Sequence, residues 1–297
     1  ADTTYRADRL PRMGETLLGN SFDIGPGGKG SNQAVAAARM GAHTTIITKL
    51  GCDDFSAMAM RIWAEAGVIP HVQQVDDNYT GAAFIFIQQA TGDNAIIIAP
   101  GAAATITPAD LDRDAAVIQG ADVFMTQLEQ PIDAAMRGLE IAKSAGVITI
   151  LNPAPAAKLP DGMLALCDYV TPNETETAEL TGIDVKTEAD AARACVALRE
   201  LGVGTPIITL GARGVFVDGI GLIRAVSAGP VVETTGAGDA FNGGFAAALA
   251  QGQSVRDAVM IANATAGISV TRPGTAPSMP TRAEVERLLA GLGEEDA

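Results

Sequence analysis

A short glycine-containing turn, Gly236-Ala237-Gly238-Asp239, precedes a run of small and apolar residues in the last quarter of the chain. Glycine tolerates sharp turns and lets backbone N–H groups approach a ligand closely. A helix beginning here would direct its free N–H groups and the positive end of its dipole toward one point, which favours a bound anion such as phosphate. Asp239, in the first turn of that helix, could then act as a general base on a hydroxyl group. Asp is also a common helix cap, and for this motif alone capping is the stronger interpretation.

A second glycine-rich segment, residues 25–34 (GPGGKGSNQA), formally satisfies the dinucleotide-binding pattern G-x-G-x-x-G. We reject that interpretation because Pro26 lies inside the turn and residues 21–24 make a poor buried strand. A phosphate-binding P-loop is excluded as well, since Lys29 is followed by Gly rather than by Ser or Thr. The segment therefore predicts a turn that presents Lys29 and Asn32 at the start of an alanine-rich helix, which suits the hydroxyl groups of a sugar. Close helix packing, with Lys29 in solvent, is the alternative.

A third polar motif, Asn173-Glu174-Thr175-Glu176, follows Thr171-Pro172 at the expected end of a strand. Side chains three positions apart lie on one face of a helix, so Asn173 and Glu176 could hold a hydrated Mg²⁺ beside phosphate groups. The same pair is an ordinary capping pattern. Taken alone, the motif predicts a cap.

Apolar strand-like runs alternate with helical patterns along most of the chain. This alternation predicts a three-layer α/β/α, Rossmann-like fold with a mainly parallel sheet and helices on both faces. Strands are predicted at residues 44–48, 122–126, 147–151, 206–210 and 214–217. Helices are predicted over residues 53–66, from 131 to near 146, and over most of the chain beyond 236. No repeat or long linker interrupts the pattern, so residues 1–297 are predicted to form a single domain.

One segment breaks the alternation. Residues 82–89 and 95–99 are apolar, and the turn-rich Thr91-Gly92-Asp93-Asn94 lies between them. This pattern predicts a β-hairpin. A hairpin inserted in an α/β chain can extend a sheet edge, or it can form a lid that covers a substrate and excludes water.

The charge balance limits the possible partners. The chain holds 20 Lys and Arg against 35 Asp and Glu, a formal net charge of −15, and such a field repels phosphate backbones and anionic membranes. We therefore expect neither a nucleic acid nor a membrane as partner.

Cys52, Cys167 and Cys195 are widely spaced, and with only His43 and His71 they form no zinc-binding pattern. Free thiols, with no bilayer-spanning run and no apolar leader, predict a cytoplasmic protein.

The three polar motifs occur in one order: GGKGSN at 27–32, TPNETE at 171–176 and TGAGDAF at 235–241. In this order and at these separations they resemble the ribokinase family of carbohydrate and nucleoside kinases, from Asp2 to about Pro280. The resemblance implies a ribokinase-like fold and ATP-dependent phosphorylation of the primary hydroxyl of D-ribose, giving D-ribose 5-phosphate and ADP. Fructose, deoxyribose, a modified hexose or a nucleoside are alternative acceptors within the family. A sugar- or nucleotide-sensing protein without catalysis is the alternative outside it.

The resemblance also implies a role for each matching position. Asp239 is the expected catalytic base, and the N–H groups of Gly236, Ala237 and Gly238 form the expected anion hole for the transferred phosphoryl group. The sugar is expected at Asp2, Gly28, Lys29, Asn32, Glu129 and Asp239. The nucleotide is expected at Asn173, Thr209, Gly211, Gly238 and Asn263.

Two metal ions follow from the same resemblance. Glu176 matches the position that organises Mg²⁺ through water. A monovalent cation, K⁺, is expected between the residues before the anion hole and the loop 269–278, at Glu233, Thr235, Ser269, Arg272, Gly274 and Ser278. Glu233 stands where the family has Asp, and its carboxylate reaches one methylene further, so weaker or rearranged ligation is expected.

The start of the chain and its hairpin complete the implied architecture. A β-sheet lid formed from about residues 5–24 and 72–99 is expected to cover the sugar and to carry the contact of a homodimer. Members of the family begin with an apolar strand that ends in Asn-x-Asp. Only Ala1-Asp2 of that pattern is present here, so that strand is expected to lie outside this sequence.

Overall fold

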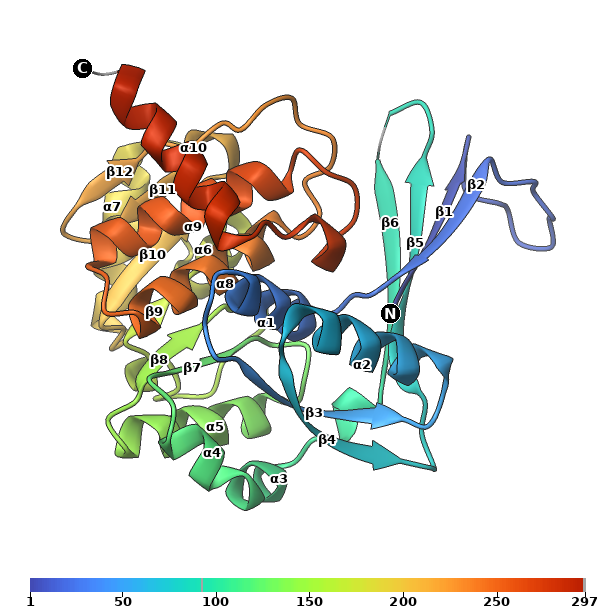
Figure 1. Cartoon of the computed structure of the whole chain (residues 1–297), viewed down its shortest axis with the longest axis horizontal. Coiled ribbons are helices and arrows are strands. Elements are labelled where there is room, and N and C mark those ends of the chain that lie inside the picture. Colours follow the sequence, from blue (N-terminus) through green and yellow to red (C-terminus); the bar gives the residue numbers. More distant parts are fainter. Residues whose placement is uncertain (92, 296–297) are drawn as a thin grey trace.

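The computed structural model describes residues 1–91 and 93–295, and its centre is a six-stranded sheet (Figure 1). In order of neighbours the strands are β12 (Gly221–Ile223), β11 (Val215–Val217), β10 (Thr205–Thr209), β9 (Tyr169–Val170), β8 (Ile148–Leu151) and β7 (Val123–Thr126). β7 to β10 run parallel, whereas β11 and β12 pair antiparallel. The four strands predicted between residues 122 and 217 are each confirmed to within about one residue.

Helices precede, separate and follow these strands along the chain. The α-helices are α1 (Lys29–Arg39), α2 (Asp54–Ala66), α3 (Pro108–Arg113), α4 (Ala115–Gln119), α5 (Ile132–Ser144), α6 (Glu174–Thr181), α7 (Glu188–Glu200), α8 (Ala237–Ala250), α9 (Val255–Ser269) and α10 (Arg282–Glu295). Short 3₁₀ helices are η1 (Ala102–Thr105), η2 (Leu164–Leu166), η3 (Gly211–Arg213) and η4 (Ala276–Ser278). Within residues 1–91 and 93–295, no helix has the length and apolar character needed to cross a membrane.

Both faces of the central sheet are covered by helices. Ile150 and Leu151 are neighbours in β8 and fully buried, and they point to opposite faces because side chains alternate along a strand. Ile150 belongs to a cluster that contains Phe245 of α8, whereas Leu151 packs in another cluster with Leu139 of α5. The prediction of a three-layer α/β/α fold is confirmed.

Local signals set the ends of α2. The side chain of Asp53 accepts a hydrogen bond from Ser56 N at 2.8 Å and caps the first turn. Gly67 ends the helix in the left-handed region, with φ of 79°. The helix predicted over residues 53–66 is confirmed for this reason, since both of its boundary residues follow strong rules.

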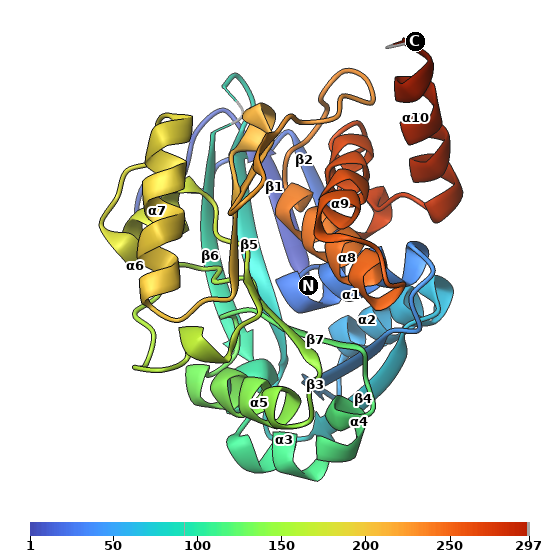
Figure 2. The same cartoon turned by 90° about the vertical axis from the view of Figure 1, so that its left-hand side faces the viewer.

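The segments expected to form the lid contribute to a separate four-stranded sheet that stands beside the α/β body (Figures 1 and 2). Its strands, in order, are β2 (Ser21–Gly25), β1 (Asp2–Ala7), β5 (Thr80–Gln88) and β6 (Asn94–Gly101). β5 and β6 form the predicted hairpin, with Phe84 opposite Ile97; Gly92 in its turn lies outside the described residues. The two parts of this sheet begin at Asp2 and at Thr80, whereas the expected lid segments begin at about residues 5 and 72.

The segment before Thr80 belongs to a different pair of strands. β4 (Ile69–Val75) runs parallel to β3 (Thr45–Gly51), and together they form a two-stranded sheet. The polar sequence of β4 (IPHVQQV) hid this strand, because most of its residues are exposed. The expected mainly parallel sheet is therefore divided into a six-stranded and a two-stranded part.

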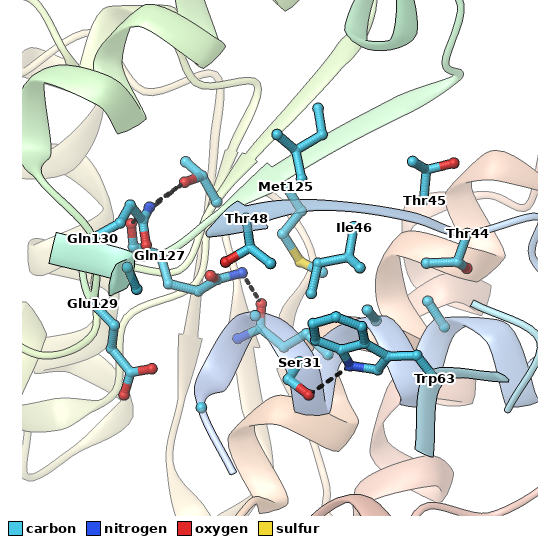
Figure 3. A pocket seen from close by; sticks show the side chains of 18 of the residues that line it. Ser31, Thr44, Thr45, Ile46, Thr48, Trp63, Met125, Gln127, Glu129 and Gln130 are labelled. Carbon is cyan, nitrogen blue, oxygen red and sulfur yellow. Dashed lines mark hydrogen bonds between the residues drawn. The ribbon is translucent and has the colours of Figure 1, made fainter. Parts of the chain in front are cut away.

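A cavity of about 820 Å³ separates these two parts. Its lining includes every residue of 44–50 and every residue of 122–127. Because the face of a strand would contribute only alternate residues, β3 and β7 both present their edges to the cavity. Figure 3 shows Ile46, Thr48 and Met125 among the side chains that line it.

Candidate active site

Asp239 lies in the first turn of α8. The helix begins directly after Gly236, which has φ of 82°. The residue is only 6% exposed. Its Oδ2 accepts a hydrogen bond from Asn32 Nδ2 at 2.9 Å, and its Oδ1 accepts one from Gln33 Nε2 at 3.0 Å. Burial raises the pKa of Asp239, while the charge of Lys29 and the two amide donors oppose that rise. This carboxylate is held in one orientation and suited to accept a proton.

The start of α8 also presents backbone donors. Ala237 N–H donates to Thr234 O at 3.1 Å and closes the turn before the helix. Among the described residues the N–H groups of Gly236 and Gly238 donate to no protein group. The expected anion hole thus keeps two of its three donors, because the first N–H of the helix is used within the turn.

Several predicted sugar-side residues meet near Asp239. Gly28 caps α1 with φ of 91°, and this turn brings Lys29 N to 2.8 Å from Glu129 Oε2. Asp2 packs so closely on Gly27 that a Cβ at Gly27 would overlap its carboxylate. Burial, assisted by the nearby charges of Glu129 and Asp239, raises the pKa of Asp2 to about 6. The structure brings these carboxylates and the α1 turn into one polar site.

The predicted nucleotide-side motif forms the helix cap that its sequence suggested. Asn173 Oδ1 accepts from Glu176 N at 2.9 Å, and Glu176 Oε2 accepts from Asn173 N at 2.9 Å. Burial raises the pKa of Glu176, and the nearby charges of Lys29 and Asp239 also act on it. The motif therefore caps α6 and also lies close enough to Asp239 for their charges to interact.

Three other predicted nucleotide positions lie on neighbouring elements. Thr209 ends β10 and forms an isolated bridge with Asn173. Gly211 begins η3 with φ of 54°. Asn263 of α9 is buried, and its Nδ2 donates to Arg224 O at 3.2 Å. Thr209 is joined directly to the Asn173 motif, whereas Asn263 is held by a different segment.

The predicted cation residues lie on two segments in contact: Glu233 and Thr235 precede α8, and the others belong to residues 269–278. Glu233 Oε2 accepts a hydrogen bond from Gly274 N at 3.0 Å. A Cβ at Gly236 would lie 3.4 Å from Thr275, whose hydroxyl donates to Pro26 O at 2.9 Å. The loop therefore connects the α8 turn with the glycine-rich turn before α1.

The remaining side chains of that loop are bound within the protein. Ser269 Oγ donates to Ala266 O and Ser278 Oγ donates to Thr275 O. Arg272 forms an ion pair with Glu284 at 2.5 Å. Thr235 is exposed. Arg272 can therefore offer a cation only its backbone oxygen, since its guanidinium is positively charged.

The order of these motifs has a counterpart among known proteins. A family model described as pfkB family carbohydrate kinase matches residues 2–282. The chain belongs to this family. The kinase is 40% identical over 292 residues to a ribokinase of Haemophilus influenzae, covering 97% of this chain and 95% of that protein. It is 36% identical over 291 residues to a deoxyribokinase of Salmonella typhi, covering 97% of this chain and 94% of that protein.

Solved structures agree with this assignment. The structure of Arabidopsis thaliana ribokinase complexed with ribose and ATP matches the kinase with a TM-score of 0.90 and 32% identity. The match covers 97% of this chain and 95% of that chain. The ribokinase-like fold predicted from the motif resemblance is confirmed.

Sequence reasoning missed part of the environment of Asp239 in this kinase. Gln33 holds one of its carboxylate oxygens, and Asn152 and Gln127 in turn bind Gln33. The available signals were two positions. Gln33 directly follows Asn32 near the start of α1, and Asn152 directly follows β8. Both residues are amides with several possible partners, so the sequence alone did not single them out.

Proposed function

We propose that this kinase transfers the γ-phosphoryl group of ATP to the primary hydroxyl of D-ribose, producing D-ribose 5-phosphate and ADP. The observation that carries the proposal is the buried Asp239 carboxylate, oriented by two amide donors at the start of α8. The relatives support the choice of substrate, because one is named ribokinase and the Arabidopsis ribokinase was solved with ribose and ATP.

In the proposed reaction, Asp239 accepts the proton of the primary hydroxyl as the hydroxyl oxygen bonds to the γ-phosphorus. The bond from the γ-phosphorus to the β,γ-bridging oxygen breaks, and ADP leaves. Such in-line transfer depends mainly on positioning and charge stabilisation. The N–H groups of Gly236 and Gly238 and the N-terminal dipole of α8 would stabilise the charge on the transferred group.

Sugar recognition is assigned to Asp2, Lys29, Asn32 and Glu129, with the backbone of Gly28. One carboxylate oxygen of Glu129 is occupied by Lys29 N–H, which leaves the other available to a sugar hydroxyl. Asn32 Oδ1 is buried and has no hydrogen-bond partner among the described residues, so a sugar hydroxyl would satisfy it. A site with such groups discriminates strongly against a sugar that lacks the matching hydroxyl.

Nucleotide binding is assigned to Asn173, Thr209, Gly211, Gly238 and Asn263. Glu176 fits Mg²⁺ held through water, because the cap uses its Oε2 and leaves Oε1 for a water molecule. In the described part of the chain no cluster of three His, Cys, Asp or Glu could hold a metal directly, which favours an ion carried mainly by the phosphates. Bound Mg²⁺ would neutralise phosphate charge.

A K⁺ site is proposed where Glu233 meets the loop 269–278. The Glu233 carboxylate and the backbone oxygens of this loop are hard ligands, which suit such an ion. Glu233 Oε2 is already hydrogen-bonded to Gly274 N, so the longer side chain still reaches the loop. The proposed residues are Glu233, Thr235, Ser269, Arg272, Gly274 and Ser278.

The outer face of the lid is proposed as a homodimer contact. The ring of Tyr5 packs against those of Phe22 and Phe84 in tilted arrangements, with ring centroids 4.7 and 5.5 Å apart. Strand register places Ile97 on the same face, opposite Phe84. Tyr5, Phe22 and Ile97 are 42%, 52% and 68% exposed. A contiguous apolar surface of this kind favours burial against a partner.

Deoxyribose is the second candidate acceptor, favoured by the likeness to the Salmonella deoxyribokinase. A coupled assay of ADP formation over ribose, 2-deoxyribose, fructose and other hexoses would separate the candidates. We expect the highest kcat/KM with ribose. A preference of more than about tenfold, or about 1.4 kcal/mol, for another sugar would contradict the proposed substrate. No turnover with any sugar would favour a sensing protein instead.

A further inference from the structure

The Gln33 side chain is fully buried, and both the nitrogen and the oxygen of its amide form hydrogen bonds. Its Nε2 donates to Asp239 Oδ1 at 3.0 Å and to Asn152 Oδ1 at 3.1 Å. Its Oε1 accepts a hydrogen bond from Gln127 Nε2 (Figure 3 labels Gln127). A primary amide has two donor hydrogens and one oxygen, so these contacts leave neither donor of Gln33 free.

The direction of this amide is set by a backbone group. Asn152 Nδ2 donates to Thr171 O at 3.2 Å. A carbonyl oxygen can only accept, so Asn152 must turn its NH₂ toward Thr171 and its Oδ1 toward Gln33. Gln33 must then present its own NH₂ to Asn152 and Asp239. A reversed amide would place its oxygen against two acceptors in a buried site, which is strongly unfavourable.

We propose that Gln33 is a positioning residue for phosphoryl transfer: it holds Asp239 Oδ1, and a relay that begins at the Thr171 carbonyl fixes the amide that does so. Asn32 holds the other oxygen of Asp239 and belongs to the expected sugar side. Gln33 is enclosed by protein groups and acts only through Asp239. The inference rests on the proposed role of Asp239 as the base and deepens it.

The charges around Asp239 determine the direction of the expected pH effect. Lys29 of α1 favours the charged carboxylate, whereas Glu129, Asp2 of β1 and Glu176 of α6 favour the protonated form. A hydrogen bond donated to a carboxylate favours its charged form. Loss of the Gln33 donor would therefore raise the pKa of Asp239 further. Since the base must be deprotonated, the acid limb of kcat would move to higher pH.

The test compares Gln33→Met with Gln130→Met. Met has a similar length and no donor, and Gln130 is a partly buried amide that binds Thr126 and the Gln127 carbonyl without contacting Asp239. For Gln33→Met we expect the acid limb of kcat to move up by about one pH unit, so that kcat measured on that limb falls about tenfold. KM for sugar and ATP should change less than about twofold, because ground-state binding is retained. Gln130→Met should keep the parent profile.

Asn152→Ala provides a second variant that leaves Gln33 in place but removes the group that fixes its direction. We expect a smaller shift of the acid limb in the same direction, with a melting temperature that shows a folded protein. An unmoved acid limb in Gln33→Met, or an equal shift in Gln130→Met, would overturn the proposal. If Gln33→Met does not fold, Asn152→Ala tests the proposal instead, and an unchanged pH profile of kcat in that variant would overturn the proposal. Turnover of ribose by the parent enzyme tests the proposed function separately. The ratio of variant kcat to parent kcat is measured with whichever sugar the parent enzyme accepts.

Discussion

Glu233 connects the turn before α8 with the loop 269–278, through its hydrogen bond to Gly274 N. A cation bound there would lie beside Gly236, because the neighbouring Thr275 is within van der Waals distance of a Cβ at that position. Its effect on the rate would be indirect, through the order it imposes on the backbone donors of α8.

We expect the parent enzyme to be more active in K⁺ than in a bulky organic cation such as tetramethylammonium. Glu233→Ala should remove most of this difference, because it removes the charged ligand. Glu286→Ala is a matched control, since that carboxylate pairs with Arg282 on α10 and does not belong to the loop. Steady-state kcat in the two salts measures the effect. Equal parent activity in both salts would contradict a functional cation site.

Single residues were predictable where a motif fixed them and not where the fold joined distant segments. Asp239 follows from its glycine turn, and Asn32 from the turn before α1. Gln33 does not, because its contact with Asp239 joins residues 206 positions apart. The use of Ala237 N–H within the turn was also hidden, because it depends on the conformation at Thr234.

At the level of elements, β3 and β7 are edge strands that lie on either side of the cavity. Each has a paired neighbour on one side only among the described strands, and both face the 820 Å³ cavity. Unpaired backbone groups inside a protein are unfavourable. The amino group of Ala1 donates to Gly81 O at 2.8 Å, and Gly51 at the end of β3 donates to Thr80 Oγ1 at 3.0 Å. Ala1 therefore lies near the carboxyl end of β3.

A short apolar segment joined to Ala1 could enter this cavity and run parallel to both strands. We expect a six-residue extension of Val and Ile to raise the free energy of unfolding by on the order of 3 kcal/mol, because burial and ladder hydrogen bonds outweigh the ordering of the segment. The melting temperature should rise by about 5 °C. A Gly/Ser extension of equal length is the control. Equal melting temperatures for the two extensions would contradict this account of the cavity.

Elements with clear boundary signals were predicted well, and polar ones were missed. α2 has an Asp cap and a terminal Gly, and β8 is a mainly apolar, buried strand. β4 carries polar residues because most of it is exposed, and the polar residues of β1 are partly buried. Their pairing is non-local and depends on the completed fold.

For the whole molecule, the proposed dimer depends on the apolar outer face of the lid. Ile97→Lys should favour the monomer, because it would bury a charge in the contact. Val196→Lys is a matched control, since Val196 is 56% exposed and lies on α7, away from the lid. Sedimentation equilibrium measures both variants. A parent that is monomeric at micromolar concentration would contradict the dimer.

The central claim is that the buried Asp239 carboxylate, held by two amides at the start of α8, is the base of a sugar kinase. The most direct test is the turnover of Asp239→Asn with ATP and ribose, with calorimetry to follow the binding of both ligands. A positioned base contributes about 10²–10⁴-fold. We predict that kcat falls by at least about 10²-fold while sugar and nucleotide still bind. Turnover equal to that of the parent enzyme would contradict the account.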